Sequence, residues 1–398
     1  MPRLIRIESD GERTVVATGS QNGPWNGVVF HEGSFFVSEG GQREGGRILR
    51  ISPGGEITAL VSDLPGMGDH HTNGPAIGPD GMIYFGQGTA TNSGVVGLDN
   101  FEFGWPARFP KFHDIPCRDV RLTGKNYTTS NPLTEDPADR AVTGAFSPFG
   151  TATTAGQVVE GKVPCSGAIM RIRASGGAPE LVAWGFRNPY GLAFTPDGRL
   201  FATDNQYDSR GSRPVFGTGD LLWRVDEGKW YGWPERFGGL ALHEHDSLAR
   251  PGAESVARLI EPWPDSAQEP IAKLGVHSAS TGLDFSRSSD FGYRGNAFIA
   301  QFGDMAPGVG KVLSPVGFKV IRVEVENGAI HDFAVNRGTT NGPASFTGSG
   351  GLERPVAARF DNSGDALYIV DFGVITISES GPRPQTETGV LWRITRRP

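Results

Sequence analysis

The sequence is poor in cysteine and in long apolar runs, and each shortage excludes a class of protein. Its only cysteines, Cys117 and Cys165, are too few for a zinc ribbon or a disulfide-rich scaffold. No segment approaches the roughly 18 consecutive apolar residues of a membrane-spanning helix. Lys and Arg number 37 against 44 for Asp and Glu, so the net charge is −7 and the basic surface typical of nucleic-acid-binding proteins is missing. The sequence therefore predicts neither a membrane span nor a nucleic-acid partner.

The N-terminus lacks the apolar segment and the cleavage site of a signal peptide. We therefore expect a cytoplasmic protein, the mature form of an exported protein, or a shortened chain. A bond between Cys117 and Cys165 would indicate an oxidising compartment. Two buried free thiols are the alternative.

Glycine, in contrast, is abundant: it supplies 58 of 398 residues, about twice its usual share of ~7%. The glycines have no three-residue period, which excludes collagen. With 29 prolines besides, a helical solenoid is not expected. Aromatic residues make up 10% of the chain and recur in short β-branched runs, so a folded all-β core is predicted rather than disorder.

A pair of short apolar strands joined by a tight turn recurs along the chain. The copies lie at residues 26–40, 74–88, 191–205, 281–304 and 355–373. A second strand pair follows each copy, at residues 46–61, 167–184, 221–233, 318–335 and 390–398. Asp-Gly, Gly-Gly and Ser-Gly pairs at the turns are hairpin signals. Units of four strands and roughly 40–50 residues are typical of β-propeller blades.

Residues 4–17 match only the second half of this unit. A propeller must close its ring or leave a sheet edge open. We therefore predict a single six-bladed β-propeller over residues 1–398 whose first blade is incomplete. The alternative is that the N-terminal strands complete the last blade.

The spacing of the repeats is uneven because residues 89–160 show little periodicity. A loop of this length is usually functional or disordered. We expect it to be a long insertion on one face of the propeller, with a shorter one at about residues 235–275. Cys117 and Cys165 stand at the two ends of the long insertion, so we predict that they are bonded.

Several candidate functional residues stand where innermost strands begin. His70, in the phrase GDHHTNG, has Asp69 and His71 beside it and could act as a general base. Arg187 and Asn188, in GFRNPYGLAF, could hold an anionic cofactor, since a guanidinium suits carboxylate groups. The alternatives are a histidine that caps a turn and an arginine that links two blades.

Three further positions follow the same logic. Arg354 and His277 also open innermost strands and could face the channel. The run at residues 204–208, DNQYD, offers oxygen atoms of the kind that calcium prefers. A polar surface loop is the alternative for that run.

Taken together, three ordered phrases carry a resemblance to a known family. GDHHTNG with IGPDGMIYF, then GFRNPYGLAFTPDGRLFATDN, then KWYGWP resemble the soluble glucose/sorbosone dehydrogenases. GQGTATNSG, HDIPCRDV and GSRPV are most similar to the bacterial sorbosone-dehydrogenase-like branch. The resemblance implies a six-bladed propeller that uses pyrroloquinoline quinone and calcium.

The resemblance also implies roles for individual residues. His70 matches the base that takes the proton of the sugar C1 hydroxyl while hydride passes to the quinone. Arg187 and Asn188 match residues that contact quinone and substrate, and Arg354, with His277, falls among the positions expected to bind the cofactor. The backbone carbonyls of Gln206 and Tyr207 match the calcium ligands. The candidate site residues are thus His70, Arg187, Asn188, His277, Arg354, Gln206 and Tyr207.

The chain departs from the family pattern at three positions. Thr89 stands where the family has an acid that supports the base. Gly303 stands near the position of a cofactor lysine, and Gln206 replaces a common glycine.

The function implied is a quinoprotein dehydrogenase that oxidises an aldose or related sugar. Its electrons would pass to an external acceptor such as a cytochrome, and the protein would be periplasmic or secreted. A calcium-dependent, lactonase-like propeller hydrolase and a non-catalytic propeller that binds a protein or glycan are the alternatives.

Overall fold

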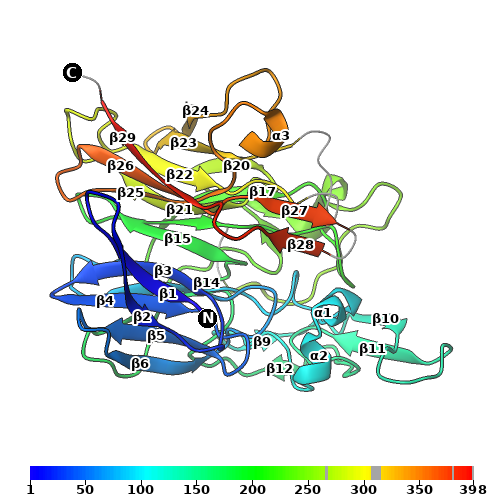
Figure 1. Cartoon of the computed structure of the whole chain (residues 1–398). Coiled ribbons are helices and arrows are strands. Elements are labelled where there is room, and N and C mark those ends of the chain that lie inside the picture. The colour runs from blue at the N-terminus through cyan, green and yellow to red at the C-terminus, as the bar shows by residue number, and fades with distance from the viewer. Residues whose placement is uncertain (265–267, 306–314, 379–380, 397–398) are drawn as a thin grey trace.

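The computed structural model describes residues 1–264, 268–305, 315–378 and 381–396 (Figure 1). Five antiparallel sheets form the body of the fold, four of them with four strands and the last with three. The first sheet contains β3 (Trp25–His31), β4 (Ser34–Glu39), β5 (Gly46–Ile51) and β6 (Ile57–Leu64). The second contains β7 (Thr72–Ile77), β8 (Ile83–Gln87), β13 (Ala168–Ile172) and β14 (Glu180–Trp184). The third contains β15 (Pro189–Phe194), β16 (Leu200–Asp204), β17 (Gly219–Val225) and β20 (Ala272–Val276). The fourth contains β21 (Ser280–Phe285), β22 (Ala297–Gln301), β23 (Lys319–Glu324) and β24 (Ala329–Ala334). The fifth contains β25 (Pro355–Phe360), β26 (Ala366–Asp371) and β29 (Val390–Thr395).

The first strand of each sheet is the innermost one. β3 packs beside β7, β7 beside β15, β15 beside β21, and β21 beside β25. This order confirms the predicted all-β propeller arrangement, in which each repeat forms one blade.

Apolar side chains fill the borders between consecutive sheets. Phe36 of the first sheet and Phe85 of the second belong to one buried cluster. Phe201 and Phe285 pack at the border between the third and fourth sheets, with ring centroids 5.1 Å apart. The core is thus a series of layers between blades, each built from alternate residues of neighbouring strands.

The expected sixth blade is wrong: the structure has five. β1 (Arg3–Ile7) and β2 (Arg13–Thr18) form a separate two-stranded sheet that pairs with neither the first nor the fifth sheet. Leu4 and Ala17 instead pack on the face of the first sheet. Because this segment supplies only two strands, and they bond to each other, it forms a hairpin rather than a blade.

A cavity of about 300 Å³ is lined by residues of all five innermost strands and of the N-terminal hairpin. Arg3 of the hairpin, Val28 of β3 and Val370 of β26 all line it. Figure 1 shows the hairpin, in dark blue, beside the first sheet. No strand pairing joins the fifth sheet to the first among the described residues; residues of both sheets and of the hairpin face this cavity instead.

The long insertion lies between β8 and β13, two paired strands of the second sheet. It contains two short helices and two small two-stranded sheets, β9–β12 and β10–β11: α1 (Leu98–Glu102), α2 (Trp105–Arg108), β9 (Val120–Arg121), β10 (Asn126–Ser130), β11 (Arg140–Gly144) and β12 (Val158–Val159). The predicted bond between Cys117 and Cys165 is confirmed, with sulfurs 2.07 Å apart.

The remaining elements are short. They are β18 (Arg236–Phe237), β19 (Leu240–Ala241), the 3₁₀ turns η1 (Leu242–Glu244) and η2 (Asp246–Leu248), α3 (Ala344–Thr347), β27 (Ile375–Ser378) and β28 (Gly381–Pro384). Within the described ranges, none of the helices has the length and apolar character needed to cross a membrane.

Candidate active site

His70 lies in the loop that leads into β7, and this loop is bonded along its length to residues 88–90. The amide of Asp69 donates to the carbonyl of Ala90 (3.1 Å), and the amide of His70 donates to that of Thr89 (3.2 Å). A Cβ at Gly88 would lie 2.3 Å from the Cβ of His70, so only glycine allows this close approach. The backbone therefore fixes the position of the Cα and Cβ atoms of His70.

The imidazole of His70 is held by one of its two ring nitrogens. Nδ1 lies 3.0 Å from the carbonyl oxygen and 3.1 Å from the hydroxyl oxygen of Thr89. A carbonyl oxygen can only accept, so Nδ1 carries the hydrogen and Nε2 of the neutral ring is the basic nitrogen. Burial, followed by the charges of Arg187 and Arg210, holds the pKa of His70 well below its usual value. The side chain is therefore a neutral base with Nε2 free of protein partners among the described residues.

The side chain of the neighbouring His71 is hydrogen-bonded within the protein. Its Nδ1 bonds to the carbonyl oxygen of Gly66 (3.0 Å), and its Nε2 lies 3.1 Å from the amide nitrogen of Gln42. Both ring nitrogens are therefore used within the protein. This difference favours His70 over His71 as the base.

Arg187 is 2% exposed and its guanidinium is bonded to protein groups. Its Nε donates to the carbonyl of Asn92 (3.2 Å) and its Nη1 to that of Asn205 (3.2 Å). Its Nη2 donates to the side chains of Asn92 (3.0 Å) and Asp208 (2.7 Å). The arginine thus ties the start of the long insertion to the third sheet, and its contact with a cofactor stays a prediction.

Asn188 belongs to a chain of side-chain amides around the axis. Asn26 donates to Asn73 (3.4 Å), Asn73 to Asn188 (2.8 Å), and Asn188 to Asn205 (3.1 Å). Asn205 then donates to the carbonyl of Ser280 (2.8 Å). The chain crosses from the first to the fourth sheet and fixes Asn188 beside the loop of His70.

His277 precedes β21 in a left-handed conformation, with φ of 54°. Its Nδ1 lies 3.5 Å from a carboxylate oxygen of Asp208, which also pairs with Arg187. The structure thus brings three predicted residues, Arg187, Asn188 and His277, into one polar group with His70.

Arg354 is bound elsewhere. Its Nη1 donates to the carbonyls of Phe302 (3.3 Å), Gly303 (3.2 Å) and Asp304 (3.1 Å), and its guanidinium lies over the rings of Phe302 and Phe318. A Cβ at Gly303 would meet the Phe318 ring at 2.5 Å. Packing thus excludes a lysine at position 303. A role for Arg354 in cofactor binding stays a prediction.

The calcium-binding role of the backbone carbonyls of Gln206 and Tyr207 stays a prediction. The carbonyl of Tyr207 accepts the hydroxyl of Thr218 (2.7 Å), and the side-chain amide of Gln206 donates to Asp204 (2.6 Å). In the part of the chain that the structure describes, no group of three or more His, Cys, Asp and Glu side chains is arranged to hold a metal ion. Any calcium bound here would therefore depend mainly on backbone carbonyls.

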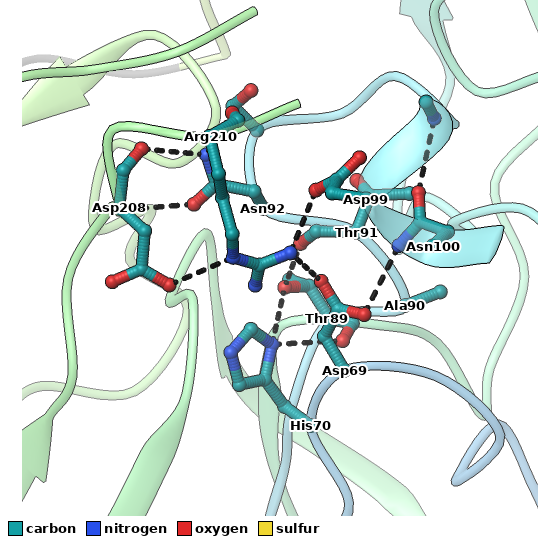
Figure 2. A network of polar contacts seen from close by, with 12 residues as sticks. Asp69, His70, Thr89, Ala90, Thr91, Asn92, Asp99, Asn100, Asp208 and Arg210 are labelled. Atoms are coloured by element: carbon teal, nitrogen blue, oxygen red, sulfur yellow. Dashed lines mark hydrogen bonds and ion pairs between the residues drawn. The ribbon is translucent and has the colours of Figure 1, made fainter. Parts of the chain in front are cut away.

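Arg210 is the main residue that the sequence pattern missed. Its guanidinium lies among three carboxylates, those of Asp69 (2.7 Å), Asp99 (2.6 Å) and Asp208 (3.1 Å) (Figure 2). These acids come from the loop before β7, from α1 and from the loop after β16. No spacing rule connects such distant positions: Asp69 and Asp208 stood in phrases that the sequence singled out, but Arg210 and Asp99 did not.

The donors near His70 suit a quinone that carries carboxylates. Pyrroloquinoline quinone presents carbonyl and carboxylate oxygens, which guanidinium and amide donors bind well. The residues that would hold it are Arg210 and Asn188, with the neutral imidazole of His70 beside them as the base. In the chemistry of their donors these residues fit the cofactor.

No family model and no curated protein sequence matches the chain. Solved structures do match in fold. A glucose dehydrogenase aligns with a TM-score of 0.56 at 16% identity, covering 100% of this chain and 91% of its own. The PQQ domain of pyranose dehydrogenase from Coprinopsis cinerea gives 0.53 at 15% identity, with coverage of 100% and 93%. The PQQ-bound aldose sugar dehydrogenase of Streptomyces coelicolor gives 0.50 at 17% identity, with coverage of 93% and 81%. The chain thus has the fold of PQQ-dependent sugar dehydrogenases.

Asp114, in the long insertion, supports the loop that holds His70. Its buried carboxylate accepts the amides of Ala90 (2.6 Å) and Thr91 (3.2 Å). Burial raises its pKa from 3.8 to about 7. Asp114 thus holds Thr89 in place through its neighbours.

Asp114→Asn should change how stability depends on pH. An acid whose pKa is higher in the folded state is stabilising only while protonated, so its contribution weakens as pH rises from about 4 to about 7. The free energy of unfolding of the wild type should therefore fall relative to that of Asp114→Asn over this range. Urea unfolding at several pH values measures it, with the exposed Asp119→Asn as control. A difference that is constant with pH would contradict the raised pKa.

Proposed function

We propose that this protein is a quinoprotein dehydrogenase that oxidises an aldose or related sugar at C1, with His70 as general base. The observation that carries the proposal is the hydrogen bond from Nδ1 of His70 to the carbonyl of Thr89. It leaves Nε2 as a neutral base at the end of the inner strands, beside Arg210 and Asn188. The likeness in fold to PQQ-dependent sugar dehydrogenases supports the same conclusion.

His70 would accept at Nε2 the proton of the C1 hydroxyl, which requires the imidazole to be neutral. Its lowered pKa meets this requirement at neutral pH. Thr89 takes the place of the family's acid: its two oxygens orient the ring without adding a negative charge. When bound, pyrroloquinoline quinone supplies the hydride acceptor, and the protein supplies orientation and the base.

The proposal extends to partner and location. The reduced site would pass electrons to an external acceptor such as a cytochrome. A periplasmic or secreted location suits the bond between Cys117 and Cys165, because disulfides persist in oxidising compartments.

Dye reduction tests the function. The purified chain, loaded with pyrroloquinoline quinone, is mixed with a panel of aldoses and a redox dye, with and without calcium. Sugar-dependent dye reduction that requires the quinone is expected. Lactone hydrolysis with calcium alone would instead identify a hydrolase. Absence of both activities, together with tight capture of a glycan or protein, would identify a binding propeller.

A further inference from the structure

Arg210 has an unusual setting for an arginine beside a candidate active site. Its Nη1 contacts Asp69 and Asp99, and its Nε donates to Asp208. The three acids approach from two different loops and from α1, so the guanidinium cannot turn without losing a partner. Its side chain is 18% exposed, and the exposed part is therefore held in one orientation.

The carboxyl groups around Arg210 are mostly buried: the side chains of Asp69, Asp99 and Asp208 are 2%, 7% and 14% exposed. Burial raises the pKa of Asp99 to about 6 in spite of the charge of Arg210. Burial alone would raise the pKa of Asp208, but the charges of Arg187 and Arg210 hold it below its usual value. Arg187 reaches only Asp208 among these acids. Arg210 is thus the cation common to all three carboxylates, a role that a divalent metal fills in many oxygen-lined sites.

One nitrogen of Arg210 is left for a ligand. Nε and Nη1 are used by the acids, whereas Nη2 has no hydrogen-bond partner among the described residues. Figure 2 shows Nη2 directed toward the imidazole of His70. The charge of Arg210 also contributes to the lowered pKa of His70, which agrees with this short approach.

We propose that Arg210 supplies the positive charge of the ligand site beside His70 in place of calcium, and that its Nη2 binds an oxygen of the quinone cofactor. The inference rests on the proposed function for the identity of the ligand. It also agrees with the finding that, among the described residues, no three or more His, Cys, Asp and Glu side chains are grouped to hold a metal ion. Arg210 would thus be a residue that contacts the cofactor, set in place by Asp69, Asp99 and Asp208.

The first test is cofactor binding without turnover. Calorimetric titration with pyrroloquinoline quinone is run on the chelator-treated protein, with and without added calcium. The dissociation constant should be the same within about twofold in both conditions. Quinone binding that appears only with calcium would overturn the inference while leaving the proposed function intact.

Variants test the contact itself. Arg210→Ala should weaken quinone binding about 10- to 100-fold, the usual effect of losing a charge-assisted hydrogen bond. Arg210→Lys keeps the charge but loses the planar set of N–H donors of the guanidinium, so it should recover part of the affinity. The matched control is Arg224→Ala, because Arg224 is 51% exposed and pairs only with Asp226. Circular dichroism verifies that each variant is folded. Wild-type affinity in both folded Arg210 variants would overturn the contact.

Calorimetric titration of the wild type with calcium, in the absence of quinone, separates the inference from the proposed function. The inference expects no calcium site of submillimolar affinity. If the wild type binds calcium tightly, the inference is wrong even where quinone binding succeeds. If no quinone binds under any condition, the proposed function fails, and the cofactor contact of Arg210 fails with it.

Discussion

His70→Ala is expected to lower the rate of sugar oxidation by about 10²- to 10⁴-fold, the usual contribution of a positioned general base. The loss arises because Nε2 is the only basic ring nitrogen that the loop before β7 leaves free. Affinity for the quinone should change far less, since the imidazole has no charge to offer a carboxylate. Steady-state kinetics with a redox dye, together with calorimetric titration of the quinone, separates the two effects.

His71→Ala is the matched control, because it removes an imidazole from the same loop. Its nitrogens bond to Gly66 and Gln42, so it should lose stability while retaining most of its turnover rate. Full activity in His70→Ala with loss in His71→Ala would assign the base to the other histidine. Full activity in both variants would exclude a histidine base in this loop.

Removal of the bond between Cys117 and Cys165 should have the largest effect on stability. The two cysteines are 48 positions apart, and the chain-entropy model gives about 4 kcal/mol for closing a loop of that length. Both sulfurs are buried beside the second sheet, so a double Cys→Ala variant also leaves a small gap in packing. Urea unfolding of this variant against the wild type measures the difference.

Reduction of the wild type by a thiol should shift the unfolding midpoint in the same direction as the double variant. The effect should also reach the site, because Ile115 and Ser166 bond to each other next to the disulfide and Asp114 adjoins them. A free energy of unfolding within about 1 kcal/mol of the wild type would show that the rest of the insertion holds these residues without the bond.

The blades could be predicted from the sequence because a hairpin turn is specified by neighbouring residues. The phrases GPDG and TPDG place turns between apolar strands, and the structure has β7–β8 and β15–β16 at those positions. The prediction was wrong where a strand partner is distant. Residues 221–233 were expected to hold a strand pair, but β17 pairs with β20 across the second insertion. Trp230 and Trp233 pack in the core as loop residues, and their apolar side chains led to the prediction of a strand there.

The candidate site was predicted only in part for a similar reason. His70 and Asn188 stand at the starts of inner strands, where the repeat itself points to the axis. Arg210 and Asn92 lie in loops whose lengths follow no repeat and Asp99 lies in α1 of the long insertion, so only the folded chain shows that they meet. The number of blades also depends on a non-local fact, namely that β1 and β2 pair with each other rather than with a neighbouring sheet.

The chain of amides from Asn26 to Ser280 joins four of the five blades on the axial side. It runs from the first sheet to the fourth, and Asn188 is one of its members. Among the described residues the fifth sheet takes no part in this chain, and it meets the first sheet at a cavity that Asn26 also lines. We therefore expect a substitution in the fifth sheet to alter the distances around Asn188 less than a substitution within the chain of amides does.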